Sequence, residues 1–160
     1  MSIDVFAYGS ILFCGLLALS IIDFRTLRLP DFLTFPLVIA GLIFSFWQGD
    51  YYGALFGAVA GYAVLAILEI VYKRLRGRDG LGRGDAKLLA AGGAWCSVTG
   101  LPFILLIASG TGLIYALILS LKSKNSGGPQ PHMIPFGPFL SLGIFVTWLV
   151  IGAGFFPQTL

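Results

Sequence analysis

Charged residues are scarce in this sequence. Only 11% of its 160 residues are Asp, Glu, Lys or Arg, whereas 58% are hydrophobic and the mean hydropathy is +0.94. The apolar stretches are too many and too long for the core of a soluble domain of this length, which excludes a soluble globular protein. The composition predicts an all-α, polytopic membrane protein that forms one membrane-embedded domain over residues 1–160.

Histidine and cysteine are also sparse. There is one histidine, His132, and the two cysteines, Cys14 and Cys96, form no CxxC pair. One histidine is too few for an HExxH zinc protease, and separated cysteines in apolar segments fit neither a zinc site nor a disulfide. We therefore expect no metal and no cofactor. A serine protease is also disfavoured, because Ser109 lies inside an apolar segment and would have to reach His132 beyond a linker.

Long apolar segments are what the sequence has in abundance. A window of about 20 residues, the length needed to cross a bilayer as a helix, locates them at residues 3–22, 32–47, 51–72, 86–98, 101–121 and 136–155. The fourth is short for a full crossing. Gly100-Leu101-Pro102 after it fits either a tight turn between two spans or a kink in one long helix.

The basic residues indicate the topology. All ten Lys and Arg fall in three connections, within residues 25–28, 73–87 and 122–124. Six spans place these connections on one side, which the positive-inside rule makes the cytoplasm, whereas five spans would send the last connection outside. We therefore expect about six transmembrane helices, with both termini outside and a retained first span in place of a cleaved signal peptide. Anionic lipid headgroups account for the net charge of +3 without a nucleic-acid partner.

A glycine-rich polar stretch at residues 77–89 interrupts the apolar pattern. It ends with Asp85, at the point where the next apolar helix begins. Glycines allow another chain to approach closely, and a carboxylate at a helix start is stabilised by unpaired N–H groups. Taken alone, the stretch also fits a plain polar turn in which Asp85 caps the helix.

A second carboxylate, Asp23, closes the first span at the same predicted membrane boundary. It fits either an interfacial ion pair with Arg25 or Arg28, or a functional role, because ionisable groups at membrane depth are costly. Two carboxylates held close together do not both ionise easily, so that one serves as an acid and the other as a base. Asp23 and Asp85 together therefore indicate the water-activating pair of an aspartic protease.

Three further acids lie near this boundary. Asp31 starts the second span and fits a helix cap. Glu69 lies near the cytoplasmic end of the third span, where it can snorkel to the interface, pair with Lys73 or face the site. Asp79 lies in the glycine-rich stretch.

Small residues also recur within the apolar segments. Gly53, Gly57 and Gly61 share one helix face at four-residue spacing, and residues 90–94 are all alanine or glycine. Such stripes let helices pack closely, and we expect a structural role for them.

At these residues the chain resembles the type IV prepilin peptidases, which are membrane-embedded aspartic proteases. The resemblance covers nearly the whole chain and is carried, in order, by residues 22–23 with 29–34, residues 80–91 with 93–95, and residues 134–138. It implies that Asp23 and Asp85 are the catalytic pair. It also implies a bacterial inner-membrane protein that cuts prepilins or pseudopilins of pili and secretion systems. Their short cationic leader is cut after a glycine, at the cytoplasmic face, just before an apolar helix.

One departure from the family concerns the CxxC motifs that its larger members carry in a region associated with N-methylation. Because this sequence has no CxxC motif, we expect a peptidase without methyltransferase activity.

The cationic leader needs acidic partners on a surface that is otherwise basic. We expect Asp31, Glu69 or Asp79 to bind it, although Asp31 and Asp79 also fit a helix cap or a pair with a nearby Arg. Gly82 and Gly84 would let the scissile peptide approach the backbone closely, and Lys87 belongs to the same predicted substrate-binding group. The oligomeric state is left open.

The alternative function is a small transporter or assembly scaffold whose two intramembrane aspartates bind protons or cations. An internal repeat would favour a transporter, and the sequence shows none by inspection.

Overall fold

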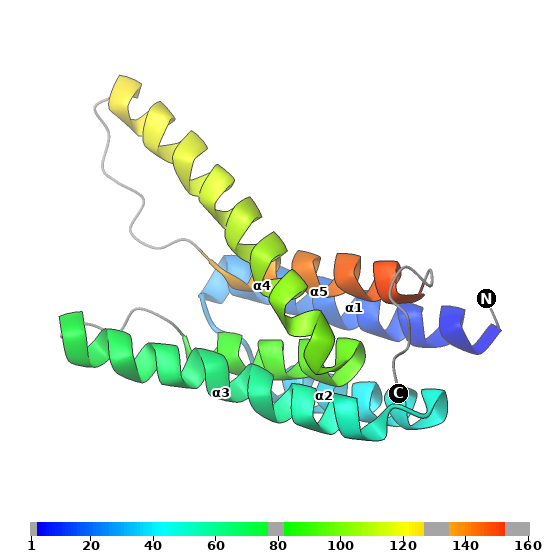
Figure 1. The fold of residues 1–160 in the computed structure, drawn as a ribbon. Coiled ribbons are helices and arrows are strands. Elements are labelled where there is room, and N and C mark those ends of the chain that lie inside the picture. Colours follow the sequence, from blue (N-terminus) through cyan, green and yellow to red (C-terminus); the bar gives the residue numbers. More distant parts are fainter. Residues whose placement is uncertain (1–2, 77–81, 127–134, 153–160) are drawn as a thin grey trace.

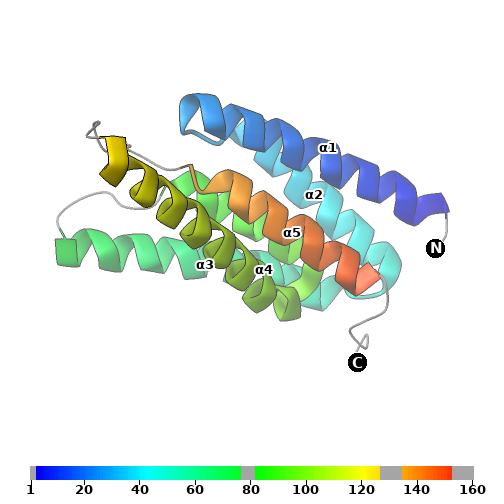
Figure 2. The same ribbon diagram turned by 90° about the horizontal axis from the view of Figure 1, so that it is seen from above.

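The computed structural model describes residues 3–76, 82–126 and 135–152. Five α-helices make up this part of the chain: α1 (Ile3–Thr26), α2 (Asp31–Gln48), α3 (Tyr51–Arg76), α4 (Arg83–Ser126) and α5 (Gly137–Gly152). Figures 1 and 2 show that α1, α2, α3 and α5 run side by side along one direction, and that the first part of α4 lies among them. The prediction of an all-α membrane protein is confirmed.

The helix α4 consists of two arms that are joined at a sharp bend. Its helical dihedrals are interrupted at Ser97, where φ is 60° and ψ is 176°. Beyond this break the second arm (residues 98–126) turns back toward the end of the bundle from which the first arm (residues 83–96) came, and leans away from the other helices (Figures 1 and 2). The sequence placed the break at Gly100-Leu101-Pro102, which is three residues too late. Pro102 instead lies inside the second arm, five residues after the break.

The described part of the chain thus runs back and forth in six segments, in the order predicted. Four stretches are long and apolar enough to cross a membrane, within α1, α2, α3 and α4, and α5 is a shorter apolar helix. The first arm of α4 rises only about 21 Å, against a hydrocarbon core of about 30 Å. This short arm is enclosed by the neighbouring helices, since its residues from Leu88 to Cys96 are buried.

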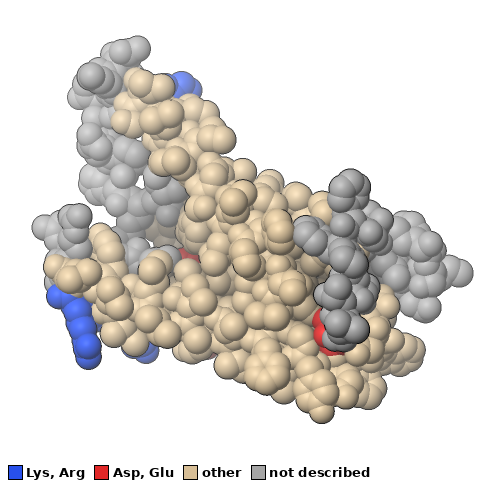
Figure 3. Space-filling view, viewed as in Figure 1, with Lys and Arg blue, Asp and Glu red and all other residues tan. Residues whose placement is uncertain are grey.

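The described basic side chains gather at one end of the bundle, which we call the basic end. Here α1 and α3 end and α2, α4 and α5 begin. The blue atoms in Figure 3 lie at this left-hand end. This one-sided distribution is the arrangement that the six-segment topology predicted.

The glycine stripe of α3 packs against the first arm of α4. A methyl group placed on Gly57 would lie 2.5 Å from the carbonyl oxygen of Gly93, and one on Gly61 would lie 2.6 Å from that of Leu89. No side chain fits at such distances, so the two backbones are in direct contact. The structural role predicted for the stripe is confirmed.

Short connections at the opposite end fix the turn from α2 to α3. Gly49 ends α2 in the left-handed conformation (φ 86°), and its N–H donates to the carbonyl of Phe46. Asp50 then caps α3 by accepting the N–H of Gly53 at 3.1 Å, and it also accepts the hydroxyl of Ser97. The same aspartate therefore holds both the start of α3 and the break in α4.

Candidate active site

Asp23 is buried one turn before the end of α1, at the basic end. Its side chain is among the few buried charged groups of the described chain, with the whole residue 5% exposed. The carboxylate oxygen Oδ2 accepts the backbone N–H of Gly137, the first residue of α5, at 3.0 Å. The Asp23 carboxylate is thus fixed by a helix start, whose dipole and free N–H groups favour a negative charge.

Gly137 can hold Asp23 only because it has no side chain. A methyl group on its Cα would lie 2.6 Å from Oδ2 of Asp23 and 3.0 Å from Cγ. The sequence showed this glycine between two prolines but gave no sign that it touches a residue 114 positions away. Gly137 is the site residue that the sequence reasoning missed.

Asp85 is the third residue of α4 and is 9% exposed. Its N–H donates to the carbonyl of Gly82 at 3.0 Å, and a methyl group on Gly82 would lie 3.7 Å from its Oδ2. Asp23 interacts electrostatically with this carboxylate. The two aspartates singled out from the sequence therefore share one site, with Gly82 beside it.

The helices that carry the two aspartates touch through the rings of Tyr8 on α1 and Trp95 on α4, whose centres lie 6.5 Å apart, but their main packing partners are other helices. Within the described residues, α1 packs on α2 and α5, whereas α4 packs on α2, α3 and α5. The two helices share the neighbours α2 and α5. Asp23 and Asp85 interact electrostatically from these two helices.

Gly84 lets the start of α4 pack closely against the connection that precedes α2. A methyl group on Gly84 would lie 2.8 Å from Cβ of Leu29. A larger residue would push the start of α4, and with it Asp85, away from this connection. Gly84 thus has a packing role that is visible in the structure.

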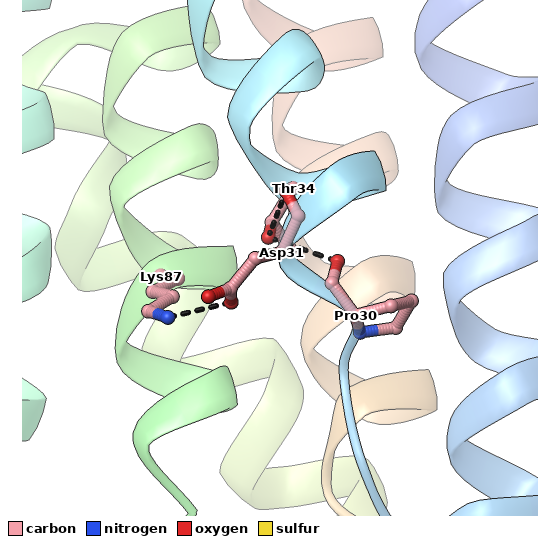
Figure 4. A network of polar contacts seen from close by, with 4 residues as sticks. All are labelled: Pro30, Asp31, Thr34 and Lys87. Carbon is pink, nitrogen blue, oxygen red and sulfur yellow. Dashed lines mark hydrogen bonds and ion pairs between the residues drawn. The ribbon is translucent and has the colours of Figure 1, made fainter.

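Asp31 and Lys87 form an ion pair between α2 and α4. Nζ of Lys87 lies 2.5 Å from Oδ1 of Asp31 and 5.8 Å from the centre of the Phe35 ring. Figure 4 shows the pair bridging the first turns of the two helices. The helix-cap interpretation of Asp31 was wrong, since Pro30 occupies the cap position and no side chain caps α2.

Glu69 pairs with a different residue of α4. Its Oε1 lies 3.6 Å from Nε of Arg83, and the Glu69 side chain is 16% exposed, against 83% for Arg83. A mostly buried carboxylate therefore has a long contact to a side chain that extends into the surroundings. Asp79, the third predicted leader-binding acid, lies outside the described residues.

Comparison with known proteins identifies the family of this chain. The model of the type IV leader peptidase family matches residues 10–117, which include both aspartates. The chain belongs to the type IV leader peptidase family. No solved structure matches it.

Curated relatives agree with this assignment. The chain is 47% identical over 136 residues to a prepilin leader peptidase/N-methyltransferase of Escherichia coli K12, covering 84% of this chain and 59% of that protein. It is 42% identical to the enzyme of the same name from Burkholderia pseudomallei 1026b (94% and 47% covered) and 38% identical to that of Neisseria gonorrhoeae (91% and 48%). The chain thus spans about half the length of the curated relatives that it matches.

Proposed function

We propose that this chain is an aspartic endopeptidase that removes the cationic leader of prepilins or pseudopilins at the cytoplasmic face of the bacterial inner membrane. Family membership gives the reaction class. The observation that carries the proposal is the buried, interacting pair Asp23 and Asp85 at the basic end of the bundle. The proposal assigns catalysis to the single membrane-embedded domain of residues 1–160.

The two carboxylates divide the proton transfers of peptide hydrolysis between them. Asp23, already bonded to the N–H of Gly137, stays charged and accepts a proton from water, while the water oxygen attacks the scissile carbonyl carbon. Asp85 donates its proton to the carbonyl oxygen. Collapse of the tetrahedral intermediate breaks the C–N bond, and the proton held by Asp23 passes to the leaving amine as Asp85 recovers its own.

The orientation of the site follows from charge. The dyad lies at the basic end, and the positive-inside rule assigns that end to the cytoplasm. A leader that is cut at the cytoplasmic face therefore meets the dyad without crossing the bilayer.

Replacement of either aspartate tests the dyad. Asp23→Asn and Asp85→Asn should each abolish cleavage of a prepilin in proteoliposomes, followed by the mass of the product, because an amide takes neither proton role. Asp50→Asn is the matched control: it keeps an acceptor oxygen for Gly53 at the opposite end of the bundle, and cleavage should persist. Normal turnover by either dyad variant would refute the peptidase mechanism and favour proton or cation binding by the two aspartates.

We also propose that acidic side chains beside the dyad bind the basic residues of the leader. Glu69 is the strongest candidate, because its shielded carboxylate makes a long contact with Arg83 and can exchange that partner for a leader cation. Asp31 can exchange Lys87 in the same way, and Asp79 is a third candidate by position in the sequence.

Charge reversal in both partners tests leader recognition. Glu69→Lys, Asp31→Lys and Asp79→Lys are each assayed against prepilins whose leader lysines are kept or changed to Glu. A recognition residue should show weaker cleavage of the cationic leader and recovery with the acidic one. If none of the three variants shows this reversal, leader recognition by these acids is refuted, although the dyad stands.

A further inference from the structure

A lipid-facing groove lies between α2 and α3, with α4 as its floor. Its volume is about 480 Å³ and its lining is almost wholly apolar. Residues from all three helices contribute: Phe35, Val38, Ala58, Val59, Ala63 and Ala90. Phe35 is 58% exposed and Val59 is 62% exposed, so the groove opens sideways, toward the membrane.

One end of the groove lies within about 3 Å of the level of Asp85 along the axis of α4. Lys87, which lines the groove, follows Asp85 by two residues on α4, and it forms the ion pair with Asp31 that Figure 4 shows. Thr34, the other polar residue of the lining next to this pair, donates its hydroxyl to the carbonyl of Pro30 at 3.2 Å, as Figure 4 shows. From the ion pair onward, the groove therefore offers apolar surface.

We propose that this groove binds the apolar helix of the substrate, the segment that directly follows the scissile bond. The proposal rests on the proposed function. A prepilin is cationic before the cut and apolar after it, and the protein has the matching order: acids Asp31 and Glu69 at the basic end, then the dyad, then an apolar groove along the membrane-embedded helices. A substrate helix in this groove places the junction between leader and helix beside Asp85.

The lining residues favour a helix as the occupant. Ala58, Ala63 and Ala90 present only methyl groups toward the groove, and small residues let a second helix approach closely in a membrane. The aromatic rings of Phe35 and Tyr62 stand at the groove on the two flanking helices and supply contact area on both sides of an inserted helix. Sideways opening also lets a helix that is already in the bilayer enter without leaving it.

Bulky substitutions in the groove test this assignment with two substrates. Ala63→Trp and Val59→Trp are assayed against a full prepilin and against a short peptide that contains the leader and scissile bond but lacks the apolar helix. The KM for the full prepilin should rise roughly tenfold or more, because the groove is filled, while kcat/KM for the short peptide stays unchanged. Leu106→Trp, on an outward-facing residue of the second arm of α4 that is 72% exposed, is the control and should leave both substrates unaffected.

Disulfide trapping gives a second, direct readout. In a Cys14→Ser background, which removes an exposed native thiol, Val59→Cys should cross-link to single cysteines in the apolar helix of the prepilin. A Leu106→Cys variant in the same background should not.

The outcomes separate this proposal from the proposed function. Unchanged KM for the full prepilin, an equal loss with both substrates, or cross-linking from both cysteine positions alike would overturn docking in the groove and leave the dyad intact. If the unmodified chain cleaves neither substrate, the proposed function fails and the docking proposal fails with it.

Discussion

Replacing Gly137 with alanine should disable the proposed site through a contact that lies outside the two carboxylates. The added methyl group would lie 2.6 Å from Oδ2 of Asp23, whereas ordinary contacts begin near 3.4 Å. The carboxylate must therefore retreat by about 0.8 Å, which stretches or breaks the 3.0 Å bond from the Gly137 N–H. Asp23 then loses both its anchor and its alignment.

The size of the effect follows from that bond. A hydrogen bond to a charged group contributes about 1.5–3 kcal/mol, and about 1.4 kcal/mol corresponds to a tenfold change in rate. Gly137→Ala should therefore lower kcat by about 10- to 150-fold, with little change in KM, because Gly137 positions Asp23 and does not contact the groove. The assay is steady-state cleavage of a prepilin in proteoliposomes.

A second glycine provides the matched control. Gly110 lies in the second arm of α4, and a methyl group there would meet nothing within 4 Å. Gly110→Ala should keep full activity and slightly stabilise its helix, by about 1 kcal/mol. Wild-type kcat in a well-folded Gly137→Ala variant, verified by its melting temperature, would refute the positioning role of α5.

Three further substitutions test the fold through thermal unfolding in detergent. Gly93→Ala should lower stability by about 1–3 kcal/mol, because its methyl group would collide with the backbone carbonyl of Gly57; an unchanged melting temperature would contradict the direct α3–α4 backbone contact. Leu27→Gly should raise stability by about 1 kcal/mol, because Leu27 has φ 52° at the end of α1 and its side chain is 47% exposed; a loss of stability would show that this side chain matters. Trp95→Phe should cost about 1–3 kcal/mol, because it removes the 2.8 Å bond from Nε1 to the carbonyl of Leu37, and a neutral effect would argue against that bond.

The aspartate pair could be predicted from sequence because each member breaks a strong local pattern. Asp23 stands at the end of an apolar run and Asp85 follows a cluster of glycines, so each is conspicuous without knowledge of the fold. The stripe of Gly53, Gly57 and Gly61 was equally easy to recognise in the sequence, because its four-residue period lies within one helix.

The features that the sequence did not reveal depend on distant partners. Gly100 and Pro102 are the local signals for a break, yet the chain turns at Ser97, whose hydroxyl bonds to Asp50, 47 residues away. Asp31 is a residue type that often caps helices, but its carboxylate pairs with Lys87, 56 residues away. Periodicity and capping preferences describe neighbours along a chain, and they carry no information on which helix will stand opposite.

The dependence of Asp23 on Gly137 has a consequence for biosynthesis. A ribosome delivers α5 after the other four described helices, so a nascent chain already contains both aspartates before the N–H that anchors Asp23 has been made. The first arm of α4, which packs on α2, α3 and α5, also lacks one of its three neighbours until that moment. The proposed dyad is therefore completed only when α5 has been made, and a chain released before residue 137 would contain both aspartates without the N–H that anchors Asp23.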